Sequence, residues 1–161
     1  MMWKKLAGAV VLAIAGNAWA ETNDVLVENA WLRESVPGQQ NISLQLNLTS
    51  IKPARLIAVS SPLAEAVKIQ LLSPAGKAKM KAREVDSLRL PRRRTVVFGE
   101  YGVALMMVGL KQELNEGDHV PVTLTVELPG KNILKLEVVA EVKRRELSYK
   151  QHSGQTVQDH R

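Results

Sequence analysis

The sequence predicts an all-β protein, folded as an antiparallel β-sandwich or a Greek-key barrel. Between residues 25 and 142, short runs rich in β-branched and other large apolar residues are separated by turns that contain Gly, Pro or Asn. No stretch in this range repeats apolar residues at helical spacing. Eight or nine short strands without an amphipathic helix are typical of these two architectures. We find no internal repeat and no linker, so we expect one domain.

The start of the chain is predicted to be a secretory signal peptide. Lys4 and Lys5 form a positive region, an apolar run follows, and Ala18-Trp19-Ala20 is a small-x-small cleavage sequence. The apolar run is too short to span a bilayer, so we expect no stable membrane span after cleavage. The expected organisation is a signal peptide (1–20), the β domain (21–142) and a basic, disordered tail (143–161).

The composition excludes several kinds of site and partner. The chain has no cysteine, so a disulfide, thiol redox chemistry and a thiolate metal ligand are all excluded. A metal would need His, Met, carboxylate or amide ligands, and a soft set of these favours copper. Most of the net charge of +6 lies in the signal peptide and the tail. Because aromatic residues are not interleaved with the basic ones, we expect no nucleic-acid partner.

The first third of the domain is expected to contain three strands. Residues 25–34 are β-rich and end at the turn sequence Val36-Pro37-Gly38. Residues 41–50 alternate strictly, which predicts a half-buried strand. Its apolar face consists of Ile42, Leu44, Leu46 and Leu48. Residues 55–60 are a further candidate, which Ser61-Pro62 ends.

A β-hairpin is predicted over residues 66–83. Residues 66–72 place Val67, Ile69 and Leu71 on one face and Lys68 and Gln70 on the other. Residues 73–76 read Ser-Pro-Ala-Gly, which is a turn signal. The second arm places its cations on one face and its small or apolar residues on the other. These are Lys77, Lys79, Lys81 and Arg83, opposed by Ala78, Met80 and Ala82. Gln70 and Met80 therefore lie on the two arms of one hairpin.

The remaining β segments are residues 88–91, 95–98, 103–109, 120–128 and 133–142. In the run 103–109, Ala104 and Met106 share one face, whereas Leu105 and Met107 share the other. We expect Met107 to fill the core, as methionine commonly does. We expect Met106 and Met80, which lie between small residues, to be on less buried faces.

An enzyme is not expected. The chain has three histidines: His119 lies in a turn that enters a strand, and His152 and His160 are in the tail. A nucleophile elbow, a zinc-protease helix motif, a phosphate loop and a dinucleotide fingerprint are all absent from the sequence. The carboxylates are scattered over turns, so their spacing indicates no acid/base pair.

Three stretches, taken in order, resemble landmarks of one family. They are Glu28-Asn29-Ala30-Trp31-Leu32-Arg33, Val59-Ser60-Ser61-Pro62-Leu63-Ala64, and Gly109-Leu110-Lys111-Gln112 followed by Glu116-Gly117-Asp118. In order and extent the set is similar to the periplasmic copper chaperones called PCu(A)C. The resemblance implies a cupredoxin-like β-sandwich in the periplasm. It also implies a protein that hands copper to the CuA centre of cytochrome oxidase or to its assembly factors.

The resemblance further implies four ligand positions. Members of the family hold copper with a His, a later Met, and then a His-x-Met pair. Carried over to this sequence, the thioether positions fall on Met80 and Met106, and the imidazole positions fall on Gln70 and Ala104. The chain thus resembles a degenerate member that lacks both ligand histidines. The candidate metal ligands are Met80, Met106 and Gln70, with Ala104 at a position that offers no donor.

The chemistry of this set favours Cu(I) over Cu(II). Cu(II) prefers imidazole nitrogen, whereas Cu(I) accepts thioethers, so Cu(I) binding is expected to be weak or absent. His152 and His160 either complete such a site from a flexible tail or lie in solvent without a role.

The predicted function is copper handling or cytochrome oxidase assembly, with periplasmic copper-assembly proteins or an oxidase subunit as partners. Two alternatives are a metal-free interaction module on the same fold and an unrelated β-sandwich adhesion or assembly subunit. The basic arm of the hairpin, together with Arg92–Arg94, also has two interpretations. Its cations either dock an acidic partner or anionic lipid head groups, or they keep a strand edge from pairing with another sheet.

Overall fold

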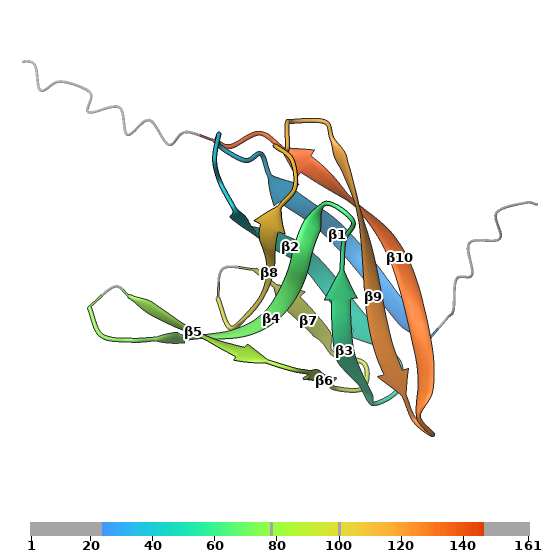
Figure 1. Cartoon of the computed structure of the whole chain (residues 1–161). Coiled ribbons are helices and arrows are strands. Elements are labelled where there is room, and N and C mark those ends of the chain that lie inside the picture. The colour runs from blue at the N-terminus through green and yellow to red at the C-terminus, as the bar shows by residue number, and fades with distance from the viewer. Residues whose placement is uncertain (1–23, 78, 100, 147–161) are drawn as a thin grey trace, which may run out of the picture.

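The chain forms ten strands and no helix in the part that the structure describes (Figure 1). The structure is a computed structural model that describes residues 24–77, 79–99 and 101–146. The strands are β1 (Val25–Arg33), β2 (Asn41–Ser50), β3 (Ala54–Ser60), β4 (Ala64–Pro74), β5 (Met80–Val85), β6 (Leu88–Leu90), β7 (Thr95–Phe98), β8 (Val103–Leu110), β9 (His119–Leu128) and β10 (Asn132–Lys143). The predicted signal peptide and the tail histidines His152 and His160 lie outside the described residues. A helix long and apolar enough to cross a membrane does not occur in the described ranges.

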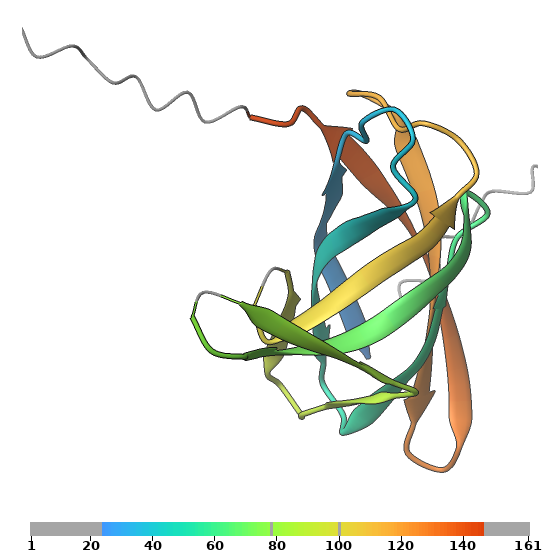
Figure 2. The same ribbon diagram turned by 60° about the vertical axis from the view of Figure 1, so that its left-hand side comes forward.

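All ten strands belong to one curled sheet. Its order is β5-β4-β8-β7-β2-β1-β10-β9-β3-β6. The sheet curves until β3 and β4 come together, which gives a nearly closed barrel (Figure 2). Most neighbours are antiparallel, whereas the β1–β10 and β7–β8 pairs are parallel. The prediction of an all-β barrel is confirmed, with ten strands in place of eight or nine.

The barrel interior is filled by the apolar faces that the alternation predicts. In β2, Leu44, Leu46 and Leu48 are at most 1% exposed, because every second side chain of a strand points to the same face. On β8 the same rule places Leu105 and Met107 in the core, both fully buried. The expectation that Met107 is a core residue is confirmed. The outward faces of these strands are available for other roles.

Strand β2 changes partner along its length. Its first half pairs with β8, and its second half pairs with β7. Strand β8 begins at this change of partner, where Leu72 N of β4 donates to Gly102 O (2.7 Å). This arrangement sets the surroundings of Ala104, which lies two residues beyond Gly102.

The β4–β5 hairpin projects from the barrel at one side (Figure 1). Its register pairs Gln70 with Glu84 and Pro74 with Met80. The strand β5 pairs with β4 and forms one edge of the sheet, and β6 forms the other. The predicted hairpin is present, although its second strand begins at Met80, three residues later than the sequence pattern suggests.

Candidate metal site

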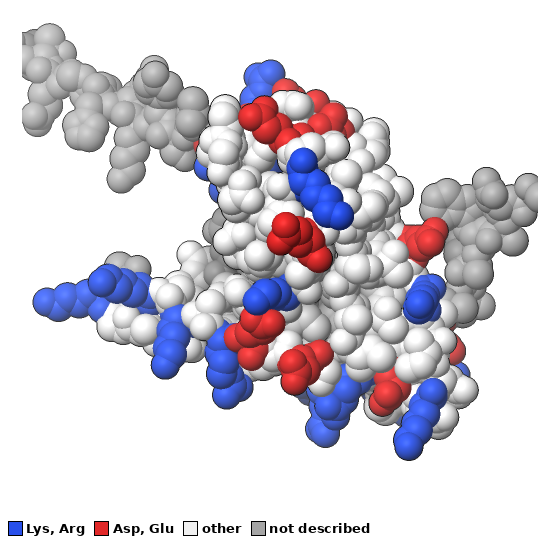
Figure 3. All heavy atoms as spheres, in the orientation of Figure 1, with Lys and Arg blue, Asp and Glu red and all other residues white. Residues whose placement is uncertain are grey.

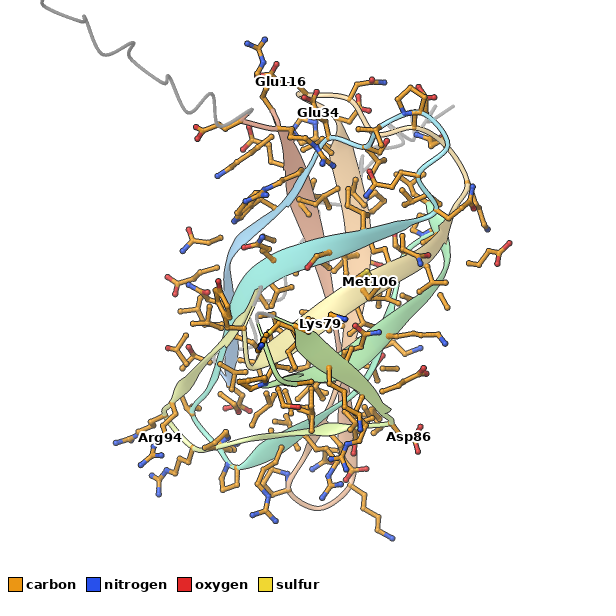
Figure 4. The ribbon with its side chains drawn as sticks, turned by 90° about the vertical axis from the view of Figure 1, so that its left-hand side faces the viewer. Glu34, Lys79, Asp86, Arg94, Met106 and Glu116 are labelled. Carbon is orange, nitrogen blue, oxygen red and sulfur yellow. The ribbon has the colours of Figure 1, made fainter. Side chains whose placement is uncertain are left out.

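Three of the four candidate positions lie together on the outer face of β4 and β8. Gln70 is directly opposite Ala104, and Met106 is opposite Lys68, one step along the same face. Because paired residues in an antiparallel ladder project to the same side, the side chains of Gln70, Ala104 and Met106 form one cluster. Figure 4 shows Met106 on β8, beyond the hairpin residue Lys79 in this view.

Met106 is half-buried between Ser43 of β2 and Lys68 of β4. On β2, Ser43 is the residue opposite Met106, and its Oγ is buried with no hydrogen-bond partner among the described residues. On the other side, Lys68 Nζ lies 2.9 Å from Glu84 Oε2. The site thus holds one soft donor, one hard oxygen and an ion pair whose two charges offset each other.

Ala104 is more buried than we expected for its face. The alternation places it outward with Met106, yet it is only 2% exposed. The reason is its place in the fold: β2 exchanges β8 for β7 at this level, and the loop that joins β7 to β8 adjoins it. The neighbouring Gln70 is half-buried, so its amide remains partly accessible.

Met80 does not lie with the other three positions. It is opposite Pro74, four residues from Gln70 along β4, which corresponds to about 13 Å in an extended strand. Met106 is opposite Lys68, six residues from Pro74, or about 20 Å along the strand. Met80 is 44% exposed on the projecting hairpin. Its outward face is the predicted one, but the register places it toward the tip of the hairpin, away from Met106.

This donor set does not suit Cu(II). Ala104 contributes no donor, and the described residues contain no group of three or more His, Cys, Asp or Glu side chains that could hold a metal. His119 is exposed at the start of β9, where it pairs with Glu141 of β10, away from β4 and β8. What remains is a single thioether beside an amide, a set whose one soft donor suits Cu(I) better than Cu(II).

Sequence reasoning placed Lys68 on the face of Gln70 but missed Ser43 and Glu84 as neighbours of the site. The alternation of β2 does place Ser43 outward, but only the pairing of β2 with β8 shows that it adjoins Met106. Likewise, the hairpin register decides that Glu84 is opposite Gln70. Residue pairing between distant strands carries no local sequence signal.

Comparisons with known proteins agree with this fold. The family model LpqE-like (lipoprotein LpqE-like) matches residues 25–138. Among curated proteins, none matches the chain.

Solved structures of PCuAC domains resemble the chain over most of its length. The copper-bound PCuAC domain from PmoF2 is 20% identical with a TM-score of 0.59, covering 76% of this chain and 94% of that domain. The apo PCuAC domain from PmoF1 is 18% identical with a TM-score of 0.62, over 76% and 95%. CuI-DR1885 from Deinococcus radiodurans is 26% identical with a TM-score of 0.54, over 78% and 83%.

The predicted resemblance to the PCu(A)C proteins and the predicted cupredoxin-like fold are both confirmed by these matches. The family match spans most of the ten strands, from the start of β1 into β10. The chain therefore belongs to the LpqE-like family, and its barrel is that of the PCuAC domains.

Proposed function

We propose that this chain is an exported copper-handling protein, similar to a copper chaperone, whose own site binds Cu(I) weakly. Support comes from its family, from the copper-bound relatives with the same fold, and from the apolar run and cleavage sequence at its start. Its location would be the periplasm, and its task would be copper supply to an oxidase CuA centre or to the proteins that assemble it.

The observation that carries this proposal is the cluster of Gln70, Ala104 and Met106 on the outer face of a PCuAC barrel. These are the positions to which the family resemblance assigns two imidazoles and a thioether. The barrel and one sulfur remain, so copper is best regarded as a transient cargo. Met106 would hold Cu(I) together with the Gln70 amide oxygen, and Met80 would offer a second, separate thioether on the hairpin.

Titration with Cu(I) against a competing chelator tests the copper part of the proposal. The wild-type chain should take up Cu(I), and Met106→Leu should remove most of that uptake because leucine preserves the volume without the sulfur. Met80→Leu is the matched control, since it removes an exposed thioether that lies apart from the cluster. Uptake by the wild type that does not exceed that of the Met80→Leu/Met106→Leu variant would refute Cu(I) binding by these residues.

A metal-free interaction module on the same fold is the second candidate function. The separation of Met80 from Met106 and the lack of a donor at Ala104 favour it. Under this proposal, the chain would act in copper-protein assembly through contact with another protein. It predicts that copper-dependent growth needs the folded barrel but tolerates Met80→Leu/Met106→Leu. Loss of that growth in the double variant would exclude it.

A further inference from the structure

Eight exposed cations lie on the hairpin and on the segment after it, with Glu84 and Asp86 between the fourth and the fifth. We call them the basic ridge: Lys77, Lys79, Lys81, Arg83, Arg89, Arg92, Arg93 and Arg94. Figure 3 shows lysine and arginine side chains along the lower side of the molecule, over the β4–β5 hairpin and the strands beneath it. Among the residues that the structure describes, none of the eight is ion-paired with a carboxylate. Their charge is therefore available to a partner.

The hairpin separates the basic ridge from the candidate metal site. Lys81 is opposite Ser73, and Arg83 is opposite Leu71. Both cations are therefore on the face of the hairpin that carries the buried Ile69 of β4. Met80, opposite Pro74, lies on the other face. A partner bound to the ridge therefore leaves the outer faces of β4 and β8 accessible.

Protection of strand edges does not account for the whole ridge. Both β5 and β6 are edges of the sheet, so Lys81, Arg83 and Arg89 could serve to block pairing with another sheet. The three consecutive arginines lie beyond β6, in the turn before β7. Arg93 N donates to Ser50 O (2.7 Å), which fastens this turn to β2. These three guanidinium groups are not on an edge strand of the sheet, so protection of an edge does not explain them.

The surroundings of these cations suit a diffuse anionic surface better than a protein. Protein interfaces have an apolar or aromatic centre inside a polar rim. Of the large apolar side chains exposed in the described part of the chain, only Met80 belongs to residues 77–94, and it lies on the opposite face. Ile51 and Val97 flank the arginine turn, but Val97 is opposite Asn47, four residues from Ile51, so the two do not form a common apolar centre. A bilayer that contains anionic lipids needs no such centre, since it attracts each cation near its surface independently. We propose that the basic ridge docks this protein on an anionic phospholipid membrane.

Vesicle sedimentation tests this proposal, which is independent of copper. The protein is used as the cell processes it, with its N-terminus established by mass spectrometry. Its binding to phosphatidylcholine vesicles is compared with binding to vesicles that also contain phosphatidylglycerol. The ridge variants are Lys79→Gln/Lys81→Gln and Arg92→Gln/Arg94→Gln. The control, Lys111→Gln/Lys135→Gln, removes two exposed lysines outside the ridge: Lys111 follows β8, and Lys135 is on β10.

The expected result is binding to the anionic vesicles only, weakened by added salt. Each ridge variant should lower the partition coefficient about 30-fold, because each cation near the surface contributes about a fivefold factor. The control should change it less than about threefold, since charges farther than a Debye length from the lipid are screened. Equal losses in ridge and control variants, or equal binding to both kinds of vesicle, would overturn the proposal. So would tighter, ridge-dependent binding to soluble polyglutamate, which would indicate an acidic protein as the partner.

Discussion

Placing histidines at positions 70 and 104 should create a site for Cu(II) and other imidazole-binding metals. Gln70 and Ala104 are directly opposite each other, so their Cβ atoms are separated by about 4.5–5.5 Å, close enough for two imidazoles to share one ion. Met106, one step along the same face, would supply a third ligand. The variant Gln70→His/Ala104→His therefore tests whether this face of the barrel can hold two imidazoles and the Met106 thioether on one ion.

The stability of this variant should fall without metal and recover with it. Ala104 is only 2% exposed, so a histidine there overpacks its surroundings at a cost of about 1–3 kcal/mol. At a free metal concentration of about 100 times Kd, binding to the folded state returns about 2.7 kcal/mol. For a domain of this size, that gain raises the unfolding temperature by about 10 °C.

Thermal unfolding with and without Cu(II) measures the effect. The stabilisation should be present at neutral pH and disappear well below the ordinary imidazole pKa of about 6.5, because protons compete with the metal for the ring nitrogens. The control is Gln70→His/Val108→His, which keeps both histidines on the outer face but separates them by four residues of β8, about 13 Å. If both variants gain equally from Cu(II), or if neither gains, the inferred site geometry is refuted.

Three further predictions concern stability, measured by urea unfolding. Met107→Ala should lower the free energy of unfolding by about 2–5 kcal/mol, because Met107 is fully buried. Met106→Ala should lower it clearly less, and equal losses would contradict the assigned faces of β8. Ser43→Ala should leave stability unchanged or raise it by up to about 1 kcal/mol, since its buried Oγ has no partner, and a loss above that size would show that it has one. Gly109→Ala should cost about 1 kcal/mol, because its φ of +68° disfavours any residue with a Cβ. Adding Glu65→Ala should restore little of that stability, because the Glu65 atoms that a new Cβ would meet belong to a flexible side chain; full recovery would show that the clash causes the loss.

Strands were predictable wherever one face of the chain is buried. The alternation of Ile42, Leu44, Leu46 and Leu48 fixes both the extent of β2 and its inward face, because a shift of one residue would expose the whole apolar set. The same argument separates Met107 in the core from Met106 on the outer face. Local alternation carries this information, since burial has a period of two along a strand.

The geometry of the candidate site was only partly predictable. Gln70, Ala104 and Met106 were assigned from a family resemblance, and the β4–β8 pairing gathers them. The place of Met80 depends on the register of the hairpin, which the sequence of the turn did not define well enough to give the first residue of β5. The burial of Ala104 depends on the change of partner along β2, which involves residues far apart in the sequence. Both features are tertiary, so local patterns cannot reveal them.

The parallel pairing of β1 with β10 has a consequence for how the molecule forms. Trp31 is paired with Glu141, a partner about 110 residues away, and β1 lies between β2 and β10 in the sheet. During synthesis, the barrel can therefore close only after its last strand has been made. Contacts over such long separations make folding slow, on the scale of milliseconds to seconds. Until β10 has been made, β1 can pair with β2 but lacks its second neighbour in the sheet.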